Sequence, residues 1–269
     1  MAYRDFVRPE AVLRARKVGA WLKWMEEQGE ILVPVAPHQP LSCLHCYGTS
    51  RYRDDDQRTW PSCWNCGRVY GDSVDTVVPI TYSLDAGLES MLHRYKDGAA
   101  VWMRRPLAAL LTVFVRKHGS CIDRDAGGID IAMTMPPDNQ QRGFDHLDRL
   151  LRGVVVGDPI LDTFGWNSEA IARDRSTPRP ARGELKPDAY TVLPGSVRDA
   201  AVLLLDDTWT SGSSASSAGA ALKAAGARHV TVLTLGRQLN VRDKFGSSEA
   251  IYHDRRAEVW TRDTCVLCA

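Results

Sequence analysis

The sequence predicts an α/β fold, in which a mostly parallel sheet is flanked by helices and preceded by a small cysteine-rich module. Strand-like apolar runs alternate with helical patterns from residue 72 onward, as in a parallel sheet covered on both faces. The unbroken apolar run 202–205 is typical of a parallel strand buried on both sides. Six of the seven cysteines form three C-x-x-C pairs. At 269 residues, the chain is long enough for one to two domains.

Charge and hydropathy exclude several classes of protein. The chain has 34 Lys+Arg and 33 Asp+Glu, so its net charge of +1 gives no strong field to hold nucleic acid or a membrane surface. The longest nearly continuous apolar run, 107–115, is far shorter than the roughly 20 residues that span a bilayer. The first residues lack the apolar core of a secretory signal. We therefore expect a cytoplasmic protein that does not bind membranes.

The first forty residues are expected to form a helix and a linker. Apolar residues recur at helical spacing over 10–29, where Trp21, Leu22 and Met25 share one face with Val18. Three prolines between residues 34 and 40 then interrupt any regular structure. The predicted organisation is a helix and linker over 1–40, a cysteine ribbon over 41–71, an α/β domain over 72–260 and a tail over 261–269.

Two of the C-x-x-C pairs have the spacing of a four-thiolate zinc ribbon. Cys43 and Cys46 are separated by sixteen residues from Cys63 and Cys66. Each pair makes a tight turn that directs two sulfurs at one point, and two such turns complete a tetrahedral shell. Two disulfides of a secreted module are the alternative, but the absence of a secretory signal favours zinc. With four protein ligands the predicted Zn²⁺ has no open position, so its role would be structural.

The remaining cysteines are harder to interpret. Cys265 and Cys268 could be a redox pair, half of a second metal site, or a replacement for one turn of the ribbon, and these alternatives stay open. Cys121 is expected to be a small buried hydrophobic residue.

The elements expected after residue 71 follow from periodicity and from Gly and Pro positions. Residues 173–186 contain three prolines and an excess of basic residues, and are expected to form a loop. The expected strands cover 77–84, 129–135, 160–164, 200–205 and 230–235, and the expected helices cover 98–117, 144–151 and 213–225.

The most informative segment is the end of the apolar strand at residue 205. Two carboxylates, Asp206 and Asp207, are followed by a hydroxyl-rich turn and an alanine-rich helix. Ligands bind at the carboxyl ends of strands in open α/β sheets, and a helix N-terminus attracts anions. A phosphate held by the turn, with two acids one sugar length away, suits a ribose 5-phosphate. The alternative is a simple helix cap after a strand with exposed acids. The predicted phosphate-loop residues are Thr208, Thr210, Ser211, Gly212, Ser213 and Ser214.

Residues 202–214 resemble the signature of the type I phosphoribosyltransferases: four apolar residues, two acids, then a Thr/Ser/Gly loop. Trp209 departs from it, being bulkier than the usual aliphatic residue. Together with the preceding cysteine ribbon, the loop resembles the ComF (competence protein F) family. Residues 93–98 (HRYKDG) and 135–146 (MPP…QRGFDH) resemble two further elements of that family, in which Asn-Gln stands where this chain has Asp-His. The resemblance covers roughly residues 40–236.

The resemblance implies a type I phosphoribosyltransferase-like fold for 72–260 and a site for 5-phosphoribosyl 1-pyrophosphate (PRPP). Asp206 and Asp207 would hold the ribose hydroxyls directly or through Mg²⁺, and residues 210–214 would hold the 5-phosphate. Arg142 would approach the pyrophosphate, for which a guanidinium is well suited, although a solvated arginine is the alternative. Lys96 is a second candidate contact. The loop arginines could close over a polyanion or remain solvated: Arg173, Arg175, Arg179 and Arg182.

Three functions are consistent with that site. The first is a pentosyltransferase (a glycosyltransferase) that uses PRPP, releases pyrophosphate and modifies an unknown acceptor. The second is a PRPP or nucleotide sensor without turnover. The third is an accessory protein of DNA uptake or processing, as a competence family implies. A weak contact with nucleic acid through the basic segments 93–117 and 173–186 and assembly into a homo-oligomer also stay open.

Overall fold

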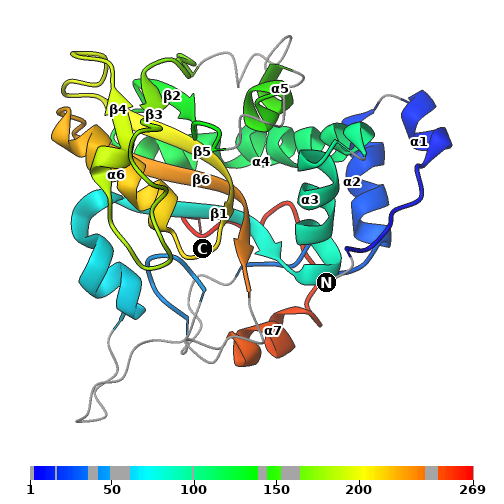
Figure 1. Cartoon of the computed structure of the whole chain (residues 1–269). Helices are drawn as coiled ribbons and strands as arrows, with labels where there is room; N and C mark the ends of the chain where they lie inside the picture. Colours follow the sequence, from blue (N-terminus) through cyan, green and yellow to red (C-terminus); the bar gives the residue numbers. More distant parts are fainter. Residues whose placement is uncertain are drawn as a thin grey trace.

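A four-stranded parallel sheet forms the centre of the structure, which is a computed structural model (Figure 1). It describes residues 3–15, 17–35, 42–48, 61–98, 100–138, 144–152, 164–239 and 248–268. All neighbouring strands of this sheet run parallel, which confirms the predicted mostly parallel α/β sheet. In sheet order, the strands are β1 (Thr76–Ser83), β6 (His229–Gln238), β5 (Ala201–Trp209) and β2 (Ile131–Thr134).

Side chains alternate between two apolar cores along the central strand β5. Leu203 and Leu205 belong to the core that contains α4 (Arg104–Asp125). Val202 and Leu204 belong to the core on the opposite face, which contains α6 (Ser213–Ala224). The strand is therefore buried on both faces, as its unbroken apolar sequence predicts.

The cysteine ribbon and the N-terminal helices lie on opposite sides of the sheet. All four ribbon cysteines belong to the core of α6. The N-terminal helices, by contrast, contribute to the core of α4, where the Trp24 ring meets Trp102 edge-on at 5.4 Å. The single helix predicted over 10–29 is wrong, because Lys17 adopts an extended conformation and separates α1 (Glu10–Ala15) from α2 (Val18–Glu27).

The remaining elements are short and border the sheet. Most of the predicted strand 160–164 lies outside the described residues. The predicted helix 98–117 begins at Arg104 and extends to Asp125, while α7 was not predicted. The short elements are α3 (Ser90–Lys96), α5 (His146–Arg152), α7 (Glu249–Arg255) and the antiparallel pair β3 (Ile171–Arg173) and β4 (Tyr190–Val192).

In the described part of the chain, no single helix is long and apolar enough to cross a membrane. One bent pair of helices, 85–96 with 101–125, passes that test by length and composition.

Close packing of α6 against the chain before β1 gives a prediction about stability. A Cβ on Gly219 would lie 2.3 Å from the Ser73 carbonyl oxygen and 2.8 Å from Val74 Cγ2. We expect Gly219→Ala to lower the free energy of unfolding by about 1–3 kcal/mol, because backbone must move to admit the methyl group. The control is Gly19→Ala on the exposed side of α2, where no atom lies within 4 Å. That change should raise the same free energy by roughly 0.5–1 kcal/mol. Denaturant titration would test the pair, and equal effects of both substitutions would contradict the packing argument.

Candidate functional site

A pocket of about 440 Å³ lies at the carboxyl ends of β5 and β2. This is the edge of the sheet at which open α/β folds bind ligands. Residues 206–215 line one side of it, and the ends of α3 and α5 contribute Lys96 and His146. The structure thus brings the predicted acid pair, the loop and Lys96 to one pocket.

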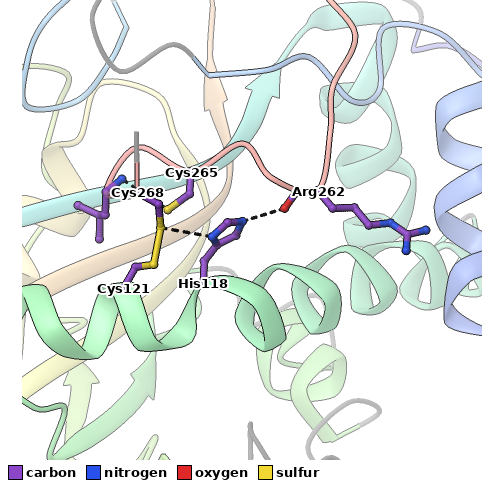
Figure 2. The surroundings of a disulfide bond; sticks show 6 residues. His118, Cys121, Arg262, Cys265 and Cys268 are labelled. Atoms are coloured by element: carbon purple, nitrogen blue, oxygen red, sulfur yellow. Dashed lines mark hydrogen bonds between the residues drawn. A yellow bond between two sulfur atoms is a disulfide. The ribbon is translucent and has the colours of Figure 1, made fainter.

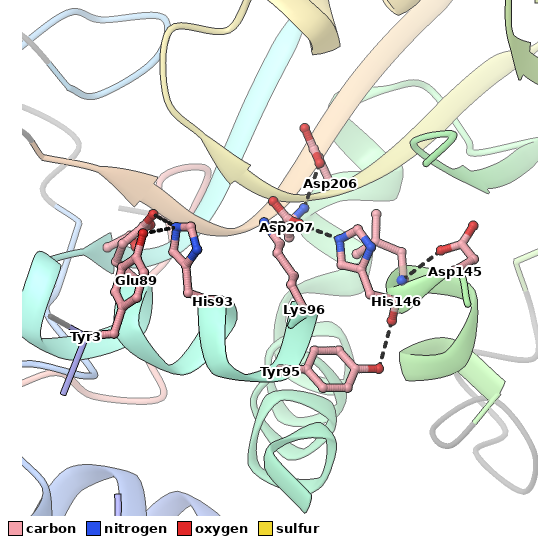
Figure 3. A network of polar contacts seen from close by, with 11 residues as sticks. Tyr3, Glu89, His93, Tyr95, Lys96, Asp145, His146, Asp206 and Asp207 are labelled. Carbon is pink, nitrogen blue, oxygen red and sulfur yellow. Dashed lines mark hydrogen bonds and ion pairs between the residues drawn. The ribbon is translucent and has the colours of Figure 1, made fainter. Parts of the chain in front are cut away.

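Asp207 is the centre of a buried polar network in this pocket (Figure 3). Its Oδ2 atom is 2.5 Å from Lys96 Nζ and 2.5 Å from His146 Nε2. Burial raises the pKa of Asp207, but Lys96 and His146 outweigh it and hold the pKa well below its usual range. Asp207 is therefore a carboxylate that already has two partners.

Asp206 lies in a different electrostatic environment from its neighbour. Burial, followed by the charge of Asp207, raises the pKa of Asp206 to about 7. Its Oδ1 atom accepts a hydrogen bond of 2.8 Å from the Asp207 backbone N–H. Two adjacent carboxylates with pKa values moved in opposite directions are typical of functional pairs. At neutral pH, Asp206 can either accept or donate a hydrogen bond.

His146 is a site residue that the sequence did not predict. Asp145 caps α5 by accepting hydrogen bonds of 2.9 and 3.0 Å from the N–H groups of Leu147 and Asp148. The cap fixes the start of the helix, and the His146 carbonyl accepts a further bond of 2.9 Å from the Tyr95 hydroxyl. These contacts hold His146 where its ring reaches Asp207. The signal available in the sequence was the Asp-His pair that departs from the family's Asn-Gln.

The predicted phosphate loop turns tightly around Trp209 and leads into α6. Gly212 has a φ of 86°, and a Cβ there would lie 2.4 Å from Trp209 Cζ2. Both the backbone conformation and the lack of space for a side chain therefore require glycine. Helix α6 then begins at Ser213, and the first N–H groups of a helix have no partners within it. Within the described residues, Thr208 Oγ1 is buried without a hydrogen-bond partner. The loop therefore offers both backbone and side-chain groups to a ligand.

One predicted loop hydroxyl has a supporting role instead. Ser213 Oγ lies 3.0 Å from the Tyr70 hydroxyl and accepts a 2.9 Å hydrogen bond from the Gly183 N–H. Tyr70 also donates to the Ser211 carbonyl at 2.8 Å. Ser213 thus joins the loop to the end of the ribbon and to the basic segment 173–186.

The four ribbon cysteines form a buried cluster that could bind zinc. The Sγ atoms of Cys43, Cys46, Cys63 and Cys66 all lie within 4.8 Å of one another. The Cys46 N–H donates to Cys43 Sγ at 3.4 Å. Hydrogen bonds from the other three thiols hold the pKa of Cys46 well below its usual range. Four soft, buried sulfur donors are the ligand set of structural Zn²⁺.

Arg237 connects this cluster to the phosphate loop. Only 3% of the residue is exposed, and its Nη2 atom is 3.4 Å from Cys46 Sγ. Its Nε–H donates to the Cys46 carbonyl at 2.8 Å, and Nη1 donates to the carbonyls of Trp209 and Thr210, both at 3.0 Å. The role of this buried arginine could not be predicted from the sequence, because its bond to Cys46 spans 191 positions.

The basic segment 173–186 is anchored at the pocket by Asp138. Arg173 Nε is 3.2 Å and Arg179 Nε is 2.9 Å from the Asp138 carboxylate. The Arg173 side chain is buried and donates to the carbonyl of Ala189 at 2.7 Å. Arg179, by contrast, is largely exposed and lines the pocket. Of these two arginines, Arg179 is therefore the one placed to contact a ligand.

One predicted site residue lies outside the described part of the chain, and one cysteine was interpreted wrongly. Arg142 lies outside the described residues, so its predicted contact with pyrophosphate stays a prediction. The interpretation of Cys121 as a hydrophobic residue is wrong, because Cys121 forms a disulfide with Cys268 (Figure 2). Cys265 is a buried free thiol, so Cys265 and Cys268 do not pair with each other in this structure.

The chain matches no model of a known protein family and none of the curated proteins with which it was compared. The ComF resemblance accordingly rests on the motifs in the sequence.

Proposed function

We propose that this protein is a Mg²⁺-dependent phosphoribosyltransferase that binds PRPP, transfers its ribosyl 5-phosphate to an acceptor and releases pyrophosphate. The supporting observation is that two carboxylates at the end of a buried parallel strand share one pocket with a loop that opens a helix. Two acids and an anion-binding loop in one pocket suit the hydroxyls and the phosphate of one sugar.

In this proposal, each side of the pocket binds one part of PRPP. The loop after Trp209 and the first turn of α6 bind the 5-phosphate through backbone N–H groups. Asp206 and Asp207 accept hydrogen bonds from the ribose hydroxyls. Among the described residues, Lys96 and Arg179 are the lysine and arginine side chains that line the same pocket, and they contact the pyrophosphate.

The donor set of the pocket also fits Mg²⁺. Carboxylate oxygens are suitable ligands for this ion, which takes most of its remaining contacts from substrate phosphates and water. Asp206 has the freer carboxylate, because Asp207 Oδ2 already contacts Lys96 and His146. When bound, Mg²⁺ would neutralise negative charge on the departing pyrophosphate.

The chain's own residues would act mainly by position and charge. Cleavage of the bond between ribose C1 and the pyrophosphate oxygen leaves positive charge on the ring and negative charge on the leaving group. The acid pair fixes the ring and lies close to the developing positive charge. The ribose hydroxyls replace Lys96 as partners of Asp207. The released Lys96 ammonium group then stabilises the pyrophosphate. The acceptor supplies the electron pair for the new bond to C1 and loses a proton.

A non-catalytic PRPP sensor is the second candidate, and the network around Asp207 favours it. A carboxylate that already contacts Lys96 and His146 can exchange these partners for a ligand without any chemistry. Release of these two side chains would then transmit binding to α3 and α5.

One experiment separates the two candidates. The full chain with Mg²⁺ and PRPP is examined by calorimetry, and pyrophosphate release is measured against a panel of bases and amines. Binding with release that depends on an acceptor supports the transferase, whereas binding without release to any acceptor supports the sensor. Absence of PRPP binding would overturn both.

A further inference from the structure

Three cysteines lie outside the ribbon, and two of them meet a histidine on the far side of the sheet. His118 and Cys121 are three residues apart on α4, so their side chains share one face of the helix. Cys265 and Cys268 come from the C-terminal turn, and Figure 2 shows all four side chains directed toward one place. His118, Cys121 and Cys268 each place one ligand atom within 4.8 Å of the other two, while Cys265 is not part of this group.

His118 is oriented as a metal-ligating histidine is. Its Nε2 atom lies 2.8 Å from the Arg262 carbonyl oxygen, which can only accept, so Nε2 carries the proton. Nδ1 then has a lone pair, and it faces Cys268 Sγ at 3.4 Å. A backbone carbonyl behind the ring is the usual second contact of a histidine that binds metal. The N···S distance is also close to the roughly 3.5 Å between nitrogen and sulfur ligands of tetrahedral zinc, given its bond lengths.

The C-terminal pair, like the first ribbon pair, directs a backbone N–H at the sulfur of its first cysteine. The Leu267 N–H, two residues on, donates to Cys265 Sγ at 3.4 Å, and the Cys46 N–H, three residues on, donates to Cys43 Sγ at 3.4 Å. Such bonds shape a C-x-x-C turn and stabilise negative charge on its first sulfur. Both C-x-x-C turns therefore bring backbone N–H groups to a thiol that is buried.

From these contacts we propose that His118, Cys121 and Cys268 hold a second zinc ion, with Cys265 of the same C-terminal turn moving in as the fourth ligand, and that this site attaches the turn to α4. Three thiolates and one imidazole make a complete tetrahedral set for structural Zn²⁺. The count of cysteines agrees, because four belong to the ribbon and three remain for one histidine. Disulfides alone would leave one of those three unpaired, as Cys265 is here.

The disulfide between Cys121 and Cys268 is then the oxidised, metal-free form of the same side chains. A dithiol reductant transfers two electrons and two protons to the disulfide, which gives two thiols and the oxidised reductant. Zinc binding afterwards displaces the protons of the three thiols, while His118 contributes its lone pair. A surface hollow bordered by Cys121, Leu267 and Cys268 gives the ion a path to the site.

Neighbouring contacts hold the C-terminal turn in position for this role. Trp260 Nε1–H donates to the Ile80 carbonyl on β1 at 3.2 Å, and Asp263 forms an ion pair with Lys117 on α4. Cys265 and Val266 belong to the core on this side of the sheet. A metal here would join residues 147 positions apart in the sequence, as the disulfide does.

The test is the zinc content of the full chain, prepared with a dithiol, loaded with Zn²⁺ and desalted. We expect about two zinc ions per chain for the wild type and about one for Cys268→Ser, whose side chain is exposed. Cys63→Ser should also bind about one, because it keeps the proposed site and loses the ribbon site. The matched histidine pair is His118→Ala, which should lose the second ion, and His253→Ala on the exposed surface of α7, which should keep it.

Cobalt provides a second readout that does not depend on how well a variant folds. The Co²⁺-loaded wild type should show the sum of a four-sulfur and a three-sulfur, one-nitrogen absorption spectrum. The proposal is overturned if the wild type binds one ion, with a mass that shows the disulfide intact after reduction. It is also overturned if Cys268→Ser and His118→Ala both retain two ions.

Discussion

Replacing Asp206 and Asp207 together with asparagine is expected to weaken PRPP binding by about 100-fold or more. Each carboxylate would lose a charge-assisted hydrogen bond to a ribose hydroxyl, worth roughly 1.5–3 kcal/mol. Two such losses exceed the 1.4 kcal/mol that corresponds to each tenfold change in affinity. The double variant would also leave Lys96 and His146 without the carboxylate that they contact at 2.5 Å. Calorimetric titration of PRPP with Mg²⁺ measures the effect.

The control is Asp130→Asn, which makes the same change near the opposite edge of the same sheet. Asp130 lies just before β2, accepts a 2.8 Å hydrogen bond from the Ala201 N–H, pairs with Arg228 and does not line the pocket. It should leave the affinity for PRPP unchanged. Inorganic pyrophosphate lacks the ribose that the acids are proposed to bind. Its binding should therefore persist in the double variant. Unchanged PRPP affinity in the double variant would exclude a role for the acids in binding ribose.

The parallel sheet could be predicted because its strands are buried on both faces. An apolar run such as 202–205, which ends in two acids, allows few other interpretations, and its position in the fold follows from simple packing rules. The break at Lys17 could not be predicted in the same way. Apolar spacing around Trp21 continues through it, and α2 packs its Trp21 ring on Trp102, which is 81 positions away in the sequence.

Site residues that are adjacent in the sequence could be predicted, whereas those that meet only in the folded chain could not. Residues 206–214 are adjacent in the sequence, so one motif revealed both the acids and the loop. His146 reaches Asp207 across 61 positions and Arg237 reaches Cys46 across 191, and no local pattern names the partner in either contact. The disulfide of Cys121 is hidden for the same reason, because its partner is 147 residues away.

Arg237 suggests why a cysteine ribbon accompanies this pocket at all. A guanidinium with 3% exposure needs partners on every side, and this one takes them from the ribbon and from the loop. The positive charge also lies beside the sulfur of Cys46, where a zinc-bound thiolate would be negative. The ribbon therefore supports the backbone of the phosphate loop, with Tyr70 as a second connection.

Replacing Arg237 with methionine is accordingly expected to destabilise the ribbon and the loop together. The variant leaves the carbonyls of Cys46, Trp209 and Thr210 without their donor, at a cost of about 1–3 kcal/mol for each buried group that stays unsatisfied. We expect the free energy of unfolding to fall by about 3 kcal/mol or more. A chelator should also remove zinc from the ribbon faster than from the wild type. Denaturant titration and chelator-monitored zinc release measure the two effects.

The matched control is Arg228→Met, which makes the same substitution just before the other end of β6. Arg228 also donates to backbone carbonyls, those of Ala126 and Gly128, but 40% of its side chain is exposed. Water can replace those bonds, so the free energy of unfolding should fall by no more than about 1 kcal/mol, with no change in zinc release. If Arg237→Met released zinc no faster than Arg228→Met, the ribbon and the loop would be independent, and the ribbon would need another explanation. If both effects appear together, one buried guanidinium couples the cysteine ribbon to the loop that lines the pocket.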